Sequence, residues 1–161
     1  MTTVSIVWGT GTGPTSTASY DTALAAANVH NYNLVTVSSV LPAAAQIDVC
    51  GDAPPLGAMG NRLTVVQSRT TRQPGADAPA VAGLGWARTA DGPGIFYEAG
   101  GSDPDRVAEE ITVGLEHGRA LRSERRWEAA AEPRIVSEPP AADVYVTAVV
   151  LGVYGRSRPM F

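Results

Sequence analysis

The sequence predicts an α+β domain in which two helices cover antiparallel sheets. Six apolar segments have the length and the flanking turn residues of strands, and only two longer segments have helical periodicity. Two helices are too few for an alternating doubly wound fold, in which most strands are followed by a helix. The 161 residues fit one domain, residues 1–161, without an internal repeat.

The first strand is predicted over residues 2–8, because Val4, Ile6 and Trp8 recur on one face. A glycine-rich stretch, residues 9–13, follows and is expected to end the strand in a close-packed turn. Phosphate binding at the start of the next helix is a weaker alternative, since the lysine of a P-loop and the glycine spacing of a dinucleotide site are both absent.

The first helix is predicted from residues 15–17, whose hydroxyls can cap its N-terminus, to about Asn28. Its buried face follows the i, i+3, i+4 and i+7 spacing, with Tyr20, Ala23, Leu24 and Ala27. Asp21 lies in the first turn beside this face. Its simplest role is to complement the helix dipole.

The rest of the chain divides at its glycines and prolines. Further strands are predicted over residues 34–41, 63–67, 80–87, 94–98 and 144–154. Connections are predicted over residues 50–61 and 69–79, a turn over 91–93 and a proline-rich linker over 132–142. The second helix is expected to start at residues 102–104, to bury Val107, Ile111 and Leu115, and to continue as a solvated charged segment over 116–126.

Composition excludes several classes of function. The net charge is −4, which argues against a nucleic-acid-binding face. No apolar run reaches the length of a membrane span, and the N-terminus lacks the pattern of a signal peptide, so a cytoplasmic protein without membrane contact is expected. Cys50 is the only cysteine, so an internal disulfide is impossible; a packing role is expected for it ahead of a nucleophilic one.

Other titratable residues offer few sites. His30 and His117 are the only histidines and fall short of a zinc site, so no metal is expected. Glu98 ends an apolar strand before a glycine turn. It is either partly desolvated and suited to proton donation, or a solvent-facing residue at a strand end.

The dipeptide Ser38-Ser39, near the end of an apolar segment, is more informative because the chain has no lysine. Lysine anchors pyridoxal phosphate, so pyridoxal catalysis is excluded. An enzyme of this composition that needs a carbonyl electron sink must make it in another way, such as converting a serine into a pyruvoyl group. The high arginine and alanine content indicates that the missing lysine is partly compositional bias.

Several segments together resemble the pyruvoyl-dependent arginine decarboxylase family. The N-terminal third supplies Thr10-Gly11-Thr12-Gly13, Tyr20-Asp21-Thr22-Ala23-Leu24 and Asn31-Tyr32-Asn33-Leu34-Val35, followed by Ser38-Ser39-Val40-Leu41-Pro42. A second match is Gly94-Ile95-Phe96-Tyr97-Glu98. The block from residues 31 to 42 is the most specific of these matches.

The resemblance implies self-cleavage between Ser38 and Ser39 into residues 1–38 and 39–161. The Ser39 hydroxyl attacks the Ser38 carbonyl to form an ester, elimination leaves dehydroalanine at residue 39, and hydrolysis yields a pyruvoyl group and ammonia. The Ser38 carbonyl is expected in a strained, polarised turn, with the Asn33 amide orienting it. The pyruvoyl group, derived from Ser39, is then the covalent cofactor.

For the reaction, the resemblance implies decarboxylation of L-arginine to agmatine. The pyruvoyl carbonyl would combine with the substrate amine and accept the electrons left by CO2. Glu98 would protonate the substrate carbon, and Asp21 would bind the guanidinium group.

The family is built from trimers of a four-layer αββα sandwich, so a homotrimer or a dimer of trimers is expected. Two alternatives stay open: a decarboxylase for another amino acid, and an unprocessed paralogue that acts as a binding or regulatory subunit.

Overall fold

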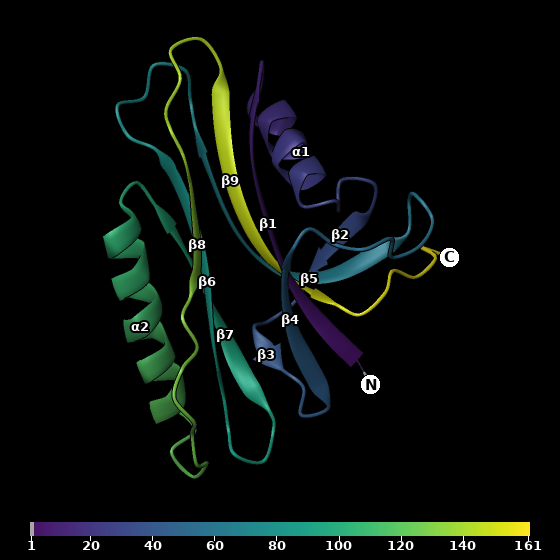
Figure 1. Ribbon diagram of the computed structural model, residues 1–161, viewed down its shortest axis with the longest axis vertical. Coiled ribbons are helices and arrows are strands. Elements are labelled where there is room, and N and C mark those ends of the chain that lie inside the picture. Colours follow the sequence, from purple (N-terminus) through teal and green to yellow (C-terminus); the bar gives the residue numbers. More distant parts are fainter. Residues whose placement is uncertain (1) are drawn as a thin grey trace.

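The computed structural model describes residues 2–161, which form two helices and nine strands (Figure 1). The helices are α1 (Ser16–Ala26) and α2 (Pro104–Ala120). The strands are β1 (Thr2–Gly13), β2 (Asn33–Thr36), β3 (Val40–Leu41), β4 (Ala45–Gly51), β5 (Arg62–Arg72), β6 (Ala80–Arg88), β7 (Gly94–Gly101), β8 (Arg134–Glu138) and β9 (Tyr145–Tyr154).

The strands form two sheets, of which only the smaller is antiparallel throughout. The five-stranded sheet has the order β2-β5-β9-β1-β4, and its two edge pairs, β1 with β4 and β2 with β5, are parallel. The four-stranded sheet has the order β3-β7-β6-β8. The α+β class is confirmed, whereas the prediction of antiparallel sheets is wrong for the larger sheet.

Three strands more than the six predicted are present among the described residues. β4 lies mostly in residues for which no element was predicted and overlaps the predicted connection only at residues 50–51, whereas β8 lies in the predicted linker; both are edge strands with one neighbour each. β8 is short and has no apolar alternation, whereas β4 does alternate, with Ala45, Ile47 and Val49 separated by polar residues, so its signal was present and was missed. The third arises because the predicted strand 34–41 is divided into β2 and β3. β5 also extends to Arg72, into a segment that was expected to be a loop.

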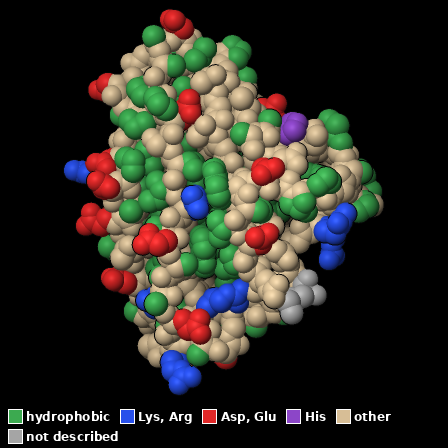
Figure 2. Space-filling view, viewed as in Figure 1, with side chains coloured by type: hydrophobic (Ala, Val, Ile, Leu, Met, Phe, Trp, Pro, Cys, Tyr) green, Lys and Arg blue, Asp and Glu red, His purple; other side chains and the backbone are tan. Residues whose placement is uncertain are grey.

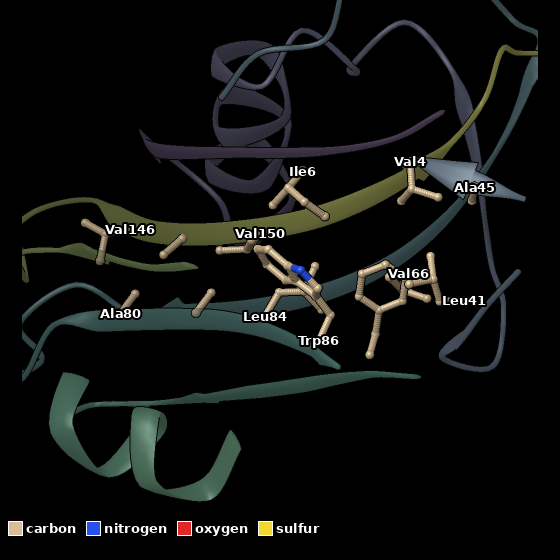
Figure 3. Close-up of a cluster of buried hydrophobic side chains, with 13 residues drawn as sticks. Val4, Ile6, Leu41, Ala45, Val66, Ala80, Leu84, Trp86, Val146 and Val150 are labelled. Atoms are coloured by element: carbon tan, nitrogen blue, oxygen red, sulfur yellow. The ribbon is translucent and has the colours of Figure 1, made fainter. Parts of the chain in front are cut away.

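Three buried clusters hold the layers together. Helix α1 packs on the outer face of the five-stranded sheet, and helix α2 packs on the outer face of the four-stranded sheet. The inner faces of the two sheets meet in the third cluster, where Ile6 and Val150 from one sheet face Leu84 and Trp86 from the other (Figure 3). The layers therefore follow in the order α1, five-stranded sheet, four-stranded sheet, α2 (Figure 1).

The glycine-rich stretch of residues 9–13 belongs to β1, so the predicted turn at Gly9 is wrong. Gly9, Gly11 and Gly13 face helix α1, and a methyl group on any of them would lie within 2.6 Å of an α1 backbone atom. Glycine is required because the helix packs directly on the strand backbone. The stretch serves helix packing, and its backbone is paired with β9 along its length.

The helix boundaries agree closely with their sequence signals. The Thr15 hydroxyl accepts a hydrogen bond from the Ala18 N–H, and Asn28 ends the first helix with a φ of 58°. Asp103 caps α2, which buries the predicted apolar residues. The charged segment after residue 120 does not continue this helix: the chain turns there and is largely irregular up to β8.

One face of the molecule carries an apolar band. Figure 2 shows apolar side chains in a band down the middle of one face, with carboxylates gathered on the side of helix α2. Neither helix of residues 2–161 has the length and apolar character needed to cross a membrane.

Candidate active site

The two serines lie where the chain passes from one sheet to the other. β2 pairs with β5 in the five-stranded sheet, and β3 pairs with β7 in the four-stranded sheet. Ser38 and Ser39 form the bend between these two short strands. The predicted single strand over residues 34–41 is therefore wrong. Its apolar character is real, but its two halves pair with different partners.

Three backbone hydrogen bonds hold this crossing. The Val37 N–H donates to the Val65 carbonyl at 3.0 Å, and the Ser39 carbonyl accepts from the Phe96 N–H at 2.9 Å. The Val40 N–H donates to the Ser38 carbonyl at 2.6 Å, which closes a three-residue turn centred on Ser39. The carbonyl of the Ser38–Ser39 peptide therefore carries a hydrogen-bond donor that polarises it.

The expected strain at this turn is not found in the backbone. Among the described residues, Asn28 is the only non-glycine residue with a positive φ, so neither serine has a left-handed conformation. The hydrogen bond from the Val40 N–H supports the predicted polarisation of the Ser38 carbonyl, whereas the backbone angles do not support the predicted strain.

Glu98 and Ser39 are in direct contact. The Ser39 Oγ donates a hydrogen bond to Glu98 Oε1, and both residues are half-buried. Glu98 lies within β7, on the same face as Phe96, which points into the space between the sheets. Of the two interpretations open from the sequence, the structure favours a partly desolvated carboxylate over one at a solvent-facing strand end.

Tyr154 is a site residue that the sequence interpretation missed. It ends β9, and its hydroxyl donates to the Val40 carbonyl at 2.9 Å. Burial, and after it the nearby Glu98 carboxylate, raise the pKa of Tyr154 to about 12. A signal was available, because Tyr154 continues the every-second-residue pattern of inward-facing side chains that includes Val146 and Val150.

Asn33 and Asp21 are not brought to the serines within one chain. The Asn33 side-chain amide donates to the Gly60 carbonyl at 2.7 Å, and β2 alone separates Asn33 from Thr36 by about 10 Å. Asp21 is exposed on α1, which covers the outer face of the five-stranded sheet, whereas Glu98 faces the space between the sheets. The larger sheet therefore lies between the two carboxylates.

The remaining candidates form no second site. His30 and His117 are both exposed, and residues 2–161 contain no group of three or more potential metal ligands. Cys50 is exposed on the edge strand β4, so the packing role expected for it is wrong. Partial burial, and after it the Asp48 carboxylate, raise the pKa of the Cys50 thiol, which disfavours the reactive thiolate.

Comparison with known proteins assigns this arrangement to a family. Residues 3–159 match the family model described as pyruvoyl-dependent arginine decarboxylase. Two proteins named pyruvoyl-dependent arginine decarboxylase, from two strains of Halobacterium salinarum, are each 46% identical over 165 residues, covering 100% of this chain and 99% of theirs. With a family match over nearly the whole chain and full-length relatives at this identity, the chain belongs to the pyruvoyl-dependent arginine decarboxylase family.

Proposed function

We propose that this chain is a self-processing carboxy-lyase that converts L-arginine to agmatine and CO2, with a pyruvoyl group made from Ser39. The observation that carries the proposal is the hydrogen bond from Ser39 to Glu98, beside a Ser38 carbonyl that is already polarised by the Val40 N–H. The family and the names of the Halobacterium salinarum relatives supply the substrate.

The site residues are suited to cleave the Ser38–Ser39 peptide. Glu98 is placed to accept the Ser39 hydroxyl proton, which makes the oxygen a better nucleophile toward the Ser38 carbonyl. The oxygen of that carbonyl gains negative charge during the attack, and the Val40 N–H is already bonded to it. Cleavage gives residues 1–38 and residues 39–161.

The same carboxylate serves the decarboxylation step. A pyruvoyl group at residue 39 would supply an electron sink, which accepts the electrons of the carbon–carbon bond that breaks when CO2 leaves. Glu98, beside that position and half-buried, holds the proton that the substrate carbon receives. Glu98 therefore acts as a base in self-cleavage and as an acid in decarboxylation. The two roles do not conflict, because self-cleavage occurs once and is complete before decarboxylation begins.

Recognition of arginine is proposed to involve two copies of the chain. Asp21 is exposed and takes part in no ion pair among the described residues, so its carboxylate is free to bind a guanidinium group. Because the five-stranded sheet lies between Asp21 and Glu98 in one chain, an Asp21 near the serines must come from a neighbouring copy. The same reasoning applies to Asn33 as the residue that orients the Ser38 peptide.

Exposed apolar side chains support this association. Val35, Val37 and Val40 flank the serines and are 44%, 37% and 51% exposed. Side chains of this kind around a reacting group are typical of a surface that a partner covers. We therefore propose that copies of the chain associate through this surface, and the family resemblance indicates a homotrimer or a dimer of trimers built from αββα sandwiches. A cytoplasmic location is also proposed.

Intact-mass measurement of the purified protein tests the proposal. We expect two fragments, residues 1–38 and 39–161, the second with a blocked N-terminus, and agmatine release from arginine. Ser39→Ala is the matched control and should stay whole and inactive, because alanine has no hydroxyl to attack or eliminate. A wild-type chain that stays whole after prolonged incubation would contradict the proposal. Turnover of another amino acid in preference to arginine would contradict the substrate alone.

A further inference from the structure

Tyr154 connects the two sheets beside the cleavage site. It belongs to β9 of the five-stranded sheet, and its hydroxyl reaches the Val40 carbonyl of β3 in the other sheet at 2.9 Å. Its ring packs edge-on against Phe96, with ring centroids 6.2 Å apart. Phe96 in turn donates its backbone N–H to the Ser39 carbonyl. The tyrosine is thus held by the same strands that hold the serine.

Val40 itself is 51% exposed, and apart from Tyr154 it is held through its neighbours: Leu41 is fully buried between the sheets, and the Ser39 carbonyl is bonded to the Phe96 N–H. β3 is two residues long, and its pairing with β7 consists of Val40 opposite Ile95 and Leu41 opposite Gly94. So short a pairing restrains the strand weakly, since each backbone hydrogen bond adds only about 0.5–1.5 kcal/mol. The hydrogen bond from Tyr154 is an anchor for Val40 that comes from outside its own sheet.

Both sides of Val40 are therefore engaged. Its N–H is bonded to the Ser38 carbonyl oxygen, and its own carbonyl is bonded to the Tyr154 hydroxyl. We propose that Tyr154 is a positioning residue for self-cleavage, which holds Val40 so that its N–H stays directed at the Ser38 carbonyl oxygen during the attack. This inference rests on the proposed function.

The chemistry explains why this position matters. In the first step the bond from Ser39 Oγ to the Ser38 carbonyl carbon forms, the bond from that carbon to the Ser39 nitrogen breaks, and the hydroxyl proton passes through Glu98 to the nitrogen. In the second, Glu98, again a carboxylate, takes the Ser39 α-proton while the Cβ–Oγ bond breaks, which expels the Ser38 carboxylate and leaves dehydroalanine. The enamine then gains a proton on Cβ, and water replaces the resulting imine nitrogen as ammonia. The first step forms a tetrahedral oxyanion on the Ser38 carbonyl oxygen that the Val40 N–H faces, so a loosely held Val40 slows that step.

Tyr154 acts through Val40 and does not itself exchange a proton. Its hydroxyl donates to a carbonyl, and the Ser39 hydroxyl is bonded to Glu98. Burial and the Glu98 carboxylate keep the Tyr154 hydroxyl protonated well above neutral pH, so it stays a donor under all ordinary conditions.

The test is the rate at which full-length Tyr154→Phe forms the two fragments, followed by intact mass. We expect cleavage about 10-fold slower than in the wild type, since removing one hydrogen-bond donor outright typically costs about 10²–10³-fold and here the donor remains but is less well placed. Tyr32→Phe is the matched control. The Tyr32 hydroxyl also donates to a main-chain carbonyl, that of Gly57, but its ring packs against the α1 side of the larger sheet. Its removal should leave the rate unchanged.

Two further measurements separate positioning from general destabilisation. Hydroxylamine cleaves an ester but not an amide, so hydroxylamine-dependent cleavage reports the first step; it should fall in Tyr154→Phe by the same factor as fragment formation. Replacing Tyr154 with p-aminophenylalanine restores an N–H donor at the same place and should restore the rate.

The inference is overturned if Tyr154→Phe cleaves at the wild-type rate, or if hydroxylamine cleavage stays normal while fragments form slowly. It is also overturned if p-aminophenylalanine is as slow as phenylalanine, which would mean that the hydrogen bond is not what matters. A wild-type chain that does not cleave at residues 38 and 39 would instead contradict the proposed function.

Discussion

Replacing Gly11 with alanine is expected to push helix α1 away from the five-stranded sheet. A methyl group at Gly11 would lie 2.5 Å from the Ala23 nitrogen, 2.7 Å from Thr22 Cβ and 2.8 Å from the Ser19 carbonyl oxygen. Atoms in contact normally stay about 3.5–4.0 Å apart, so the helix must retreat by about 1 Å. Two of the three contacts are backbone atoms, and no side-chain rotation can relieve them.

The expected loss follows from this clash. Overpacking costs about 1–3 kcal/mol, and a clash with backbone belongs at the upper end of that range. In a chain of this size each kcal/mol lowers the melting temperature by about 2–4 °C, so a decrease of about 6–12 °C is expected. The same retreat displaces Asp21 on α1, and the KM for arginine should rise by about 10-fold or more.

Calorimetry of Gly11→Ala in a Ser39→Ala background measures the change in melting temperature on a single uncleaved chain. Steady-state kinetics of Gly11→Ala in the self-cleaving protein measure the KM for arginine. Gly101→Ala is the control, because a methyl group there lies at an ordinary 3.5 Å from Val107 Cγ2. It should melt within about 2 °C of the parent. If Gly11→Ala also melts that close to the parent, the direct packing of α1 on β1 is refuted.

Three further predictions concern the site. Glu98→Gln should lower kcat for agmatine release by about 10²–10⁴-fold and should also slow self-cleavage, because both steps need its proton transfer; a normal cleavage rate would limit Glu98 to decarboxylation. Asp21→Asn should lower kcat/KM for arginine by about 10–100-fold, mainly through KM, since a hydrogen bond to a charged group contributes about 1.5–3 kcal/mol; Asp105→Asn, on the exposed first turn of α2, should have no effect. The pKa of Tyr154 is raised in the folded state, so its contribution to stability is full below about pH 10 and is lost as the pH rises through about 12. The melting temperature of Ser39→Ala should therefore fall across that window, and adding Tyr154→Phe should reduce the fall; an identical pH dependence with phenylalanine would contradict the burial of this hydroxyl.

The helices illustrate how far local signals reach. Thr15 and Asp103 were recognisable as helix caps because a capping side chain bonds to its own first turn, within three residues. The inward face of β1 was likewise predictable, since alternation requires only neighbouring residues. The edge strand β8 was missed because its five residues do not alternate, whereas β4 was missed although Ala45, Ile47 and Val49 alternate with polar residues.

The sequence by itself determined the family resemblance and proposed which residues carry the chemistry. The block around Ser38-Ser39 and the strand that carries Glu98 pointed to one family, and the comparison with known proteins confirmed that family. The sequence also excludes pyridoxal catalysis through a lysine Schiff base, because the chain contains no lysine.

Only the tertiary structure decided how these residues meet. It shows that the two serines bridge two sheets, that Ser39 bonds to a carboxylate 59 residues away, and that Val40 is held by a tyrosine 114 residues away. It also places Asp21 on the far side of a sheet from Glu98. The physical reason is that local periodicity records whether a side chain is buried, whereas the partner of an edge strand is set by non-local pairing of backbone groups that every sequence shares.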